Sequence, residues 1–258
     1  MRWVPTMKGT IERRLLVNYR VDPEVVTRLL PEPFMPHIVG GSAVAGICLI
    51  RLGHLRPIGV PAALGVTSEN AAHRVAIQWR EPDGMHRGVY IPRRDTSSRL
   101  TTLVGGRLFP GDHHRARFHV QEDSGRYDVA FASLDGTARA AVSGRAAVEL
   151  PAGSIFSSLS EASAFFRDSP LGYSSTRDPR TCDGLELRCA TWEVEALTVE
   201  HAESSFFDDE QLFPVGSVEL DSALVMRAVP ATWHAMGALA TGDRSILATP
   251  SSTPTPNG

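Results

Sequence analysis

Short runs in which apolar and polar residues alternate fill much of the chain, and turn-forming residues separate them. The runs "HRVAIQW" at 73–79 and "MHRGVYI" at 85–91 flank a Pro-Asp-Gly turn. Three more runs, at 115–121, 126–134 and 137–150, follow at similarly short intervals. A period of two interrupted by such turns is typical of antiparallel strands. We therefore predict a β-hairpin in the first pair and a β-meander in the next three.

Helical signals are few. Asp22 is a candidate N-cap for a helix over 23–30, because a proline occupies the first helical position and a Pro-Glu-Pro sequence follows. Two further short helices are predicted over 96–105 and 159–168, and one long strand, or two, over 187–201. The pattern as a whole predicts a mainly β (β-rich α+β) fold with a few short helices.

No internal repeat and no linker rich in proline or glycine divides the alternating part of the chain. We therefore expect one domain over residues 1–245. The segment 246–258 is rich in serine, threonine and proline, and such a composition predicts a disordered tail.

Composition narrows the classes of function. The 258 residues are 42% hydrophobic and 21% charged, with a formal net charge of −3, so we expect neither a nucleic-acid nor a membrane partner. No apolar run reaches the roughly 20 residues of a membrane helix, and the N-terminus has no signal-like apolar core. The three cysteines have no CxxC spacing, which predicts reduced thiols and a cytoplasmic protein.

The chain carries a single lysine, Lys8, among 26 basic residues. Schiff-base catalysis needs a buried lysine amine, and Lys8 lies in a segment expected to be exposed. Glycine-rich nucleotide loops, the GxSxG elbow, HExxH and paired zinc cysteines are all absent from the sequence. We expect no cofactor and no metal.

The alternation places two ionisable residues on an apolar strand face. In residues 68–79, Glu69 and His73 have the parity of the apolar positions that follow them. Arg74 has the opposite parity and is expected to face away. A carboxylate and an imidazole on an apolar face are costly unless they are paired or functional.

The sequence "GGRLFPGDHHRARF" contains two adjacent histidines that parity separates. His114 has the parity of Ala116 and Phe118, so we expect it to face the interior. His113 has the parity of the arginines in the run that follows, so we expect it to face solvent.

Glu69, His73 and His114 could act as general acids and bases if they face one cavity. Each histidine could instead be a hydrogen-bonded core residue. A metal site is a third alternative, although the histidines lack tight ligand spacing.

Two arginines are candidates for holding a substrate anion. Arg107 could bind a carboxylate in bidentate fashion, or it could pair with a structural acid. Arg94 stands beside Asp95 in "IPRRDTSS". These two residues could form an ion pair, or Asp95 could cap the following helix.

Several segments resemble the acetoacetate decarboxylase-like superfamily. The segment "YRVDPEVVTRLLPEPF" at 19–34 is similar to its N-terminal pattern of a strand, an Asp-capped helix and Leu-Pro-Glu-Pro. "TSE" at 67–69 is similar to its Tyr-x-Glu, and "GGRLFPGDHHR" at 105–115 to the segment with the Schiff-base lysine. The runs "GVYIPRRDTSS", "SSFF" and "FPVGSVELDSALVMR" resemble the DUF2071 branch more closely, over most of residues 10–235.

The resemblance implies roles by position. Glu69 falls on the family's active-site glutamate, His114 on its reactive lysine and Arg107 on the arginine of Gly-Arg. A second family glutamate, on the strand around 46–49, has no counterpart. The family's N-terminal active-site arginine has no clean match either. Without the lysine, decarboxylation through an iminium is not available.

The fold that the resemblance implies is a closed, cone-shaped β-barrel with a flanking antiparallel sheet, whose cavity holds small organic molecules. We expect an enzyme with lyase- or isomerase-type acid–base chemistry (dehydration, aldol-type addition or cyclisation) on a carbonyl-bearing substrate. The alternatives are a non-catalytic ligand-binding protein and a scaffold whose cavity is filled. A homo-oligomer is possible on the same analogy. The residues expected at the pocket are catalytic Glu69, His114 and His73, and substrate-binding Arg107, Tyr90, Arg94, Trp79 and Phe118.

Overall fold

The computed structural model describes residues 4–100 and 111–242, and these are dominated by strands. The strands are β1 (Met7–Val21), β2 (Met35–Pro36), β3 (Ile38–Val39), β4 (Ser42–Pro57), β5 (Val66–Glu81), β6 (Gly84–Thr96), β7 (His113–Asp123), β8 (Arg126–Ser133), β9 (Arg139–Ala147), β10 (Leu171–Ser175), β11 (Thr181–Cys189), β12 (Glu195–Ser204), β13 (Val218–Ala235) and β14 (Leu239–Ala240). The helical elements are α1 (Pro23–Leu29), the 3-10 turn η1 (Ala62–Leu64) and α3 (Leu159–Arg167).

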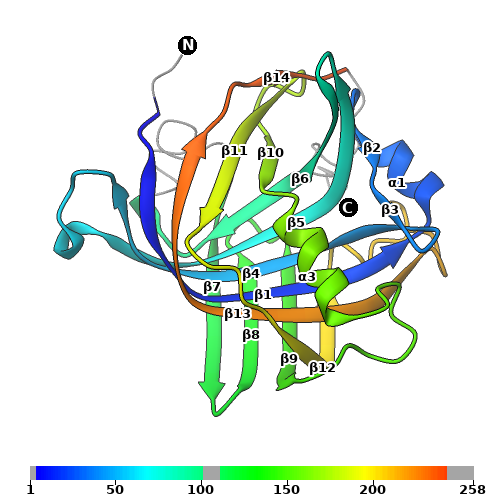
Figure 1. The fold of residues 1–258 in the computed structure, drawn as a ribbon. Helices are drawn as coiled ribbons and strands as arrows, with labels where there is room; N and C mark the ends of the chain where they lie inside the picture. The colour runs from blue at the N-terminus through cyan, green and yellow to red at the C-terminus, as the bar shows by residue number, and fades with distance from the viewer. Residues whose placement is uncertain (1–3, 101–110, 243–258) are drawn as a thin grey trace, which may run out of the picture.

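Strand pairing closes the sheet on itself in two circuits that share a wall. The shared wall runs β13-β1-β4-β5-β6. Strands β7, β8, β9 and β12 close the larger circuit, and β10 and β11 close the smaller one by pairing with β6 and β13. Figure 1 shows β7, β8 and β9 on one side of the shared strands and β10 and β11 on the other.

Because the shared strands have a circuit on each side, both of their faces are buried. In β1, Leu15 and Val17 pack in the core of the larger circuit, whereas Leu16 packs on the opposite face. A strand that is buried on both faces reads as a continuous apolar run rather than as an alternation. This explains why "AVAGICLI" in β4 lacks the period of two that marks β7 and β8.

The predicted hairpin and meander are confirmed. β5 and β6 pair antiparallel around the Pro-Asp-Gly turn, and β7, β8 and β9 pair antiparallel in sequence order. The run at 187–201 is divided between two strands, β11 and β12.

Two of the predicted helices are present in the described chain. The Asp22 side chain caps α1 by accepting a hydrogen bond from the Glu24 N–H at 2.8 Å. The second, α3, begins after Ser158, whose side chain accepts a hydrogen bond from Glu161 N–H. Half of the predicted helix at 96–105 lies outside the described residues, as does the whole of the predicted tail at 246–258, and Thr96 belongs to β6. No helix of the described ranges has the length and apolarity needed to cross a bilayer.

Candidate functional site

A cavity of about 530 Å³ lies within the smaller circuit, and each of that circuit's strands contributes to its wall. Helix α3 and the segment at 190–192 line it as well. Its volume is within the range of small-molecule sites, about 300–1,000 Å³. This volume therefore argues against the alternative of a scaffold whose cavity is filled.

Two polar residues that line this cavity, Arg74 and His113, have the parity that the sequence pattern assigned to the outside. Arg74 lines it, although Arg74 was expected to face away from the interior. The expectation was wrong because β5 belongs to the shared wall, so both of its faces are covered. Arg14 and Cys48, on β1 and β4, lie on this same cavity side of the wall.

Arg74 reaches across the neighbouring strand to a buried amide. Asn18, Gly46 and Arg74 form one cross-strand row, and the Arg74 Nη2 donates to Asn18 Oδ1. A side chain at Gly46 would place its Cβ 2.3 Å from the Val17 carbonyl oxygen and 3.1 Å from Arg74 Nη2, so glycine leaves the passage open. The guanidinium carbon lies 4.6 Å from the centre of the Phe166 ring. Arg74 Nε and Nη1 have no hydrogen-bond partner among the described residues.

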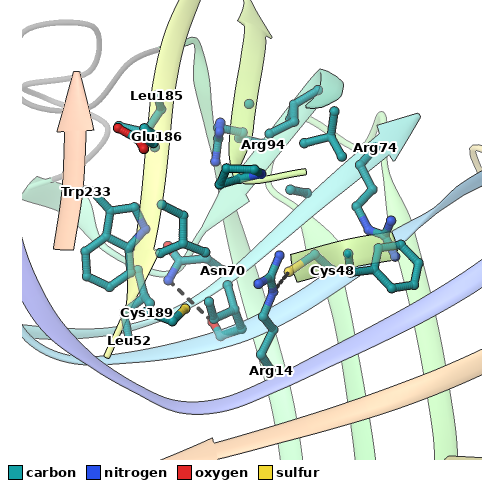
Figure 2. A pocket seen from close by; sticks show the side chains of 18 of the residues that line it. Arg14, Cys48, Leu52, Asn70, Arg74, Arg94, Leu185, Glu186, Cys189 and Trp233 are labelled. Atoms are coloured by element: carbon teal, nitrogen blue, oxygen red, sulfur yellow. Dashed lines mark hydrogen bonds between the residues drawn. The ribbon is translucent and has the colours of Figure 1, made fainter. Parts of the chain in front are cut away.

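Arg14 approaches the same space from β1 (Figure 2). Its Nε donates to the Cys48 sulfur at 3.3 Å, and its guanidinium carbon lies 5.9 Å from the centre of the Trp192 ring. Within the described part of the chain, Arg14 Nη1 is buried without a hydrogen-bond partner. A second cation therefore has hydrogen-bonding capacity that the described residues do not use.

Arg94 and His113 are cross-strand neighbours on β6 and β7. An extra residue in β6 opposite Arg74 shifts the register, so Ile91 and Arg94 both line the cavity. Arg94 Nε donates to Ser174 Oγ at 2.9 Å, and His113 Nδ1 donates to the Gly111 carbonyl at 3.2 Å. Burial lowers the pKa of Arg94 to about 10.

His113 is a neutral imidazole at the cavity wall. Burial first, and then the charge of Arg94, lower its pKa to about 3. We expected His113 to face solvent, and the structure places it on the cavity instead. Its outer face is covered because the Asp112 N–H donates to the Ser175 carbonyl and holds the start of β7 beside β10. Further along the strand the same face is exposed at Arg117 and His119.

The charges around the cavity do not balance. In the described part of the chain, Arg14, Arg74 and Arg94 make no ion pair with a carboxylate. The two carboxylates on the wall are already engaged, Asp95 with Arg93 at 2.9 Å and Glu186 with Arg188 at 2.8 Å. Buried cations without a counter-charge are costly, so an anionic ligand would stabilise this arrangement.

Glu69 lies on the other face of β5, in a four-residue ion-pair network. Its carboxylate accepts from Arg13 Nη2 and from Arg51 Nε, each at 2.5 Å. Arg13 also donates to Glu122 at 2.6 Å, and Arg51 lies 3.7 Å from the same carboxylate. Glu69 does not line the main cavity, and both of its oxygens are engaged.

His73 packs inside the larger circuit. It is fully buried, its ring lies 4.7 Å from that of Phe206, and its Nε2 is 3.4 Å from Ser204 Oγ. Burial, and then the charge of Arg93, lower its pKa to about 3. His73 is therefore a neutral core residue away from the cavity lining.

His114 lies toward the surface. Its Nδ1 is 2.8 Å from Asp135 Oδ2, and about a third of its side chain is exposed. It does not line the main cavity. The structure therefore does not bring Glu69, His73 and His114 around one pocket.

Of the residues expected to bind substrate, one lines the cavity and the others do not or are not described. Arg94 lines the cavity. Tyr90 and Trp79 belong to the core of the larger circuit, and Phe118 packs against that core beside an open groove on β7 to β9. Arg107 lies outside the described residues.

A one-residue shift relates the family-based assignment to the observed cavity. Asn70 lines the cavity next to Glu69, and His113 next to His114. Along a strand, a shift of one residue moves a side chain to the opposite face. Arg14, from the N-terminal strand, lines the cavity too, and Cys48 comes from the strand where no second glutamate was found. Charge alone did not mark this face in the sequence, because Arg14 follows Glu12 and Arg13 in β1 and Arg74 follows His73 in β5.

One group of possible metal ligands occurs among the described residues, Glu81, Asp83 and His86 at the β5–β6 turn. Their ligand atoms lie within 4.8 Å of one another. The group is away from the cavity wall, and all three of its members are engaged: His86 pairs with Asp83, and Glu81 accepts from Trp79 Nε1.

The buried state of His73 predicts a pH-dependent stability. An unfolded histidine binds a proton below a pKa of about 6.5, whereas folded His73 does so below about 3. The unfolded state therefore holds more protons between these values, so the free energy of unfolding falls as pH drops through that window. Between pH 7 and 4.5, the free energy of unfolding of His73→Leu should fall by about 2 kcal/mol less than that of wild type, as measured by urea denaturation. Equal losses would show that His73 is protonated when folded.

Comparisons with known proteins agree with this architecture. MppR, an enduracididine biosynthesis enzyme complexed with pyruvate, aligns with TM-score 0.60 and 13% identity over 94% of this chain and 92% of its own. MppR is also similar when complexed with the condensation product of pyruvate and imidazole 4-carboxaldehyde, with TM-score 0.56 and 14% identity over 95% of this chain and 92% of its own. Acetoacetate decarboxylase from Legionella pneumophila aligns with TM-score 0.60 and 10% identity over 93% and 92% of the two chains.

A third protein, an acetoacetate decarboxylase-like enzyme from Sphingomonas wittichii RW1, aligns with TM-score 0.56 and 14% identity over 92% of each chain. A search of the curated proteins gives no match. The profile of DUF2071, described as an uncharacterized conserved protein, matches residues 8–228. The chain therefore belongs to the DUF2071 family and has the acetoacetate decarboxylase-like fold.

Proposed function

We propose that this protein is a small-molecule enzyme that binds a carbonyl-bearing organic acid in the main cavity and forms an enolate there. The observation that carries the proposal is the surplus of three guanidinium groups, Arg14, Arg74 and Arg94, on a wall whose two carboxylates are paired elsewhere. Guanidinium groups bind carboxylates through two parallel hydrogen bonds. Arg14 and Arg74 retain unused donors for this purpose.

Arg94 and His113 are the candidates for the chemical step. Removal of a proton from the carbon next to a carbonyl leaves negative charge on the carbonyl oxygen, and a preplaced cation stabilises that charge. A carbonyl oxygen only accepts hydrogen bonds, so the contact to Gly111 places the proton of neutral His113 on Nδ1. The Nε2 is then the acceptor nitrogen of the ring.

A bound anion would adjust the basicity of His113. The charge of Arg94 contributes to the low pKa of the imidazole. A carboxylate next to Arg94 opposes that charge and raises the pKa of His113 from its low value, while burial, the larger cause, remains. Substrate binding would in this way activate the base.

The fold neighbours support the choice of substrate class. MppR is described in complexes with pyruvate and with a condensation product of pyruvate. The present chain has one lysine, Lys8, and that residue does not line the main cavity. We therefore assign the stabilisation of the enolate to guanidinium groups rather than to an iminium, and propose lyase- or isomerase-type chemistry.

We also propose that the protein acts in the cytoplasm as a single domain. Cys48, Cys182 and Cys189 are free thiols, which fits a reducing compartment. Burial raises the pKa of Cys182 to about 12. A thiol of that kind is inert toward oxidation.

The proposal is tested by exchange of the methyl protons of pyruvate with deuterium in heavy water, followed by proton NMR. This exchange reports enolate formation without a second substrate. We expect wild type to accelerate it and His113→Asn to lose the acceleration, while the adjacent His114→Asn retains it. Binding of pyruvate without exchange would make the protein a ligand-binding protein. Equal loss in both variants would contradict the assignment of His113.

A further inference from the structure

The cavity has two ends of different chemistry. Figure 2 shows Trp233, Leu52 and Cys189 on one side of the space and Arg74 on the other, with Arg14 and Arg94 between them. The guanidinium groups of the cationic end are the ones left without carboxylate partners. A ligand that filled the cavity would therefore meet charge at one end and hydrocarbon at the other.

The apolar end belongs to a packed cluster on the shared wall. Leu52, Leu55 and Trp233 are buried members of this cluster. Its residues on the cavity wall include Leu52, Leu55, Leu185, Leu187, Trp192 and Trp233. Because these side chains are held by packing on their far side, the wall is preformed rather than assembled by the ligand.

The polar groups near the apolar end are already satisfied within the protein. Asn70 Nδ2 donates to the Ser68 carbonyl at 3.0 Å and to Ser68 Oγ at 3.1 Å. Glu186 is paired with Arg188. This side of the cavity therefore offers a ligand apolar contact rather than a second set of charged partners.

The volume exceeds what a short acid needs. A space of about 530 Å³ is suited to a ligand of drug-like size, for which sites span about 300–1,000 Å³. A three-carbon acid held at the cationic end would leave the tryptophan wall in contact with water. A hydrocarbon tail along that wall would remove this apolar surface from water, which is favourable.

We infer that the ligand of this cavity is an amphipathic carbonyl acid. Its carboxylate lies among Arg14, Arg74 and Arg94, and its alkyl or aryl tail of several carbons lies along Leu52, Leu185 and Trp233. The inference rests on the proposed function, because it assigns the substrate class of the same cavity. The inference also assigns substrate specificity to the contact between the apolar wall and the tail of the ligand.

The test compares two 2-oxo acids with the same head group, pyruvate and 2-oxooctanoate, by titration calorimetry on the full chain. Each methylene buried contributes about fourfold in affinity. We expect 2-oxooctanoate to bind at least about tenfold more tightly than pyruvate, and 2-octanone, which lacks the carboxylate, to bind at least about tenfold more weakly than 2-oxooctanoate.

A variant that fills the apolar end locates the tail. Cys189→Phe places a large ring on the tryptophan side, so the affinity ratio of the two acids should fall at least about tenfold. Val148→Ala, at a position that is 85% exposed, should keep the ratio of wild type. Acids that bind within tenfold of each other, or a ratio that Cys189→Phe leaves unchanged, would overturn the inference. Binding of both acids with similar affinity leaves the proposed function standing, whereas binding of neither would overturn both.

Discussion

Replacing Arg13 by methionine is expected to lower the free energy of unfolding by about 3 kcal/mol, although Arg13 is not part of the cavity wall. Arg13 is 1% exposed and donates to Glu69 and to Glu122. Its removal leaves two carboxylates sharing Arg51, whose side chain is a third exposed. Breaking a buried ion pair by deleting one partner is strongly destabilising because the remaining charge is uncompensated. Urea denaturation measures the effect.

Arg126→Met is the matched control. Arg126 pairs with Glu200 at 2.7 Å, but its side chain is more than half exposed, so its removal should cost less than about 1 kcal/mol. Adding Glu69→Gln to Arg13→Met should recover part of the loss, because it removes one of the orphaned charges. If Arg13→Met is as stable as Arg126→Met, Glu69 is not held for structural reasons and regains its place as a candidate catalytic residue.

Replacing Arg94 by glutamine has the largest expected effect on function. Arg94 lies beside His113 on the cavity wall. The loss of one preplaced group that stabilises developing negative charge typically lowers turnover by about 10²–10³-fold. We expect the rate of pyruvate proton exchange to fall by that factor in Arg94→Gln. Deuterium incorporation followed by NMR measures it.

The Arg94→Gln variant should have nearly the same free energy of unfolding as wild type. In the described structure, Arg94 donates to Ser174 Oγ and has no carboxylate partner, so it contributes an uncompensated charge to the folded state. Removing such a charge should change the free energy of unfolding by no more than about 1 kcal/mol. A loss of several kcal/mol would assign Arg94 to the architecture, and unchanged exchange would remove it from the mechanism.

Where a strand has one covered face, the sequence predicts its structure well. The alternation in β7 and β8 marks strands with a core side and a solvent side, and the antiparallel meander follows from it. The cap at Asp22 is equally local, since it needs only the residues of one turn. The structure of these elements is determined by residues that lie close together in the sequence.

The candidate site is different because it depends on which strands share a wall. Parity correctly places Glu69 and His73 on one side of β5 and Arg74 on the other. It does not reveal that both sides are interior, because closure depends on pairings between distant segments, such as β11 with β13. The face assigned to solvent therefore lines the cavity, and the interior face is a filled core.

The wrong prediction for the adjacent histidines, His113 and His114, has a similar cause. The side of β7 that carries His113 is exposed over most of the strand, and only its first residues lie against β10 and the cavity. A periodic pattern averages over the whole strand and misses this local cover. The charged residues are no better guide, because Arg14 stands beside Arg13 in β1 and Arg74 beside His73 in β5, and only one residue of each pair lines the cavity.

The most direct test of the central claim is a crystal structure of the protein with a bound 2-oxo acid, pyruvate or 2-oxooctanoate. The claim is that the arginine-lined cavity of the smaller circuit binds the substrate. We predict the carboxylate within hydrogen-bond distance of at least two of Arg14, Arg74 and Arg94, with the carbonyl carbon beside His113. An acid bound instead at Glu69, or beside His114 and Asp135, would contradict the claim and return the site to the face that the sequence pattern favoured.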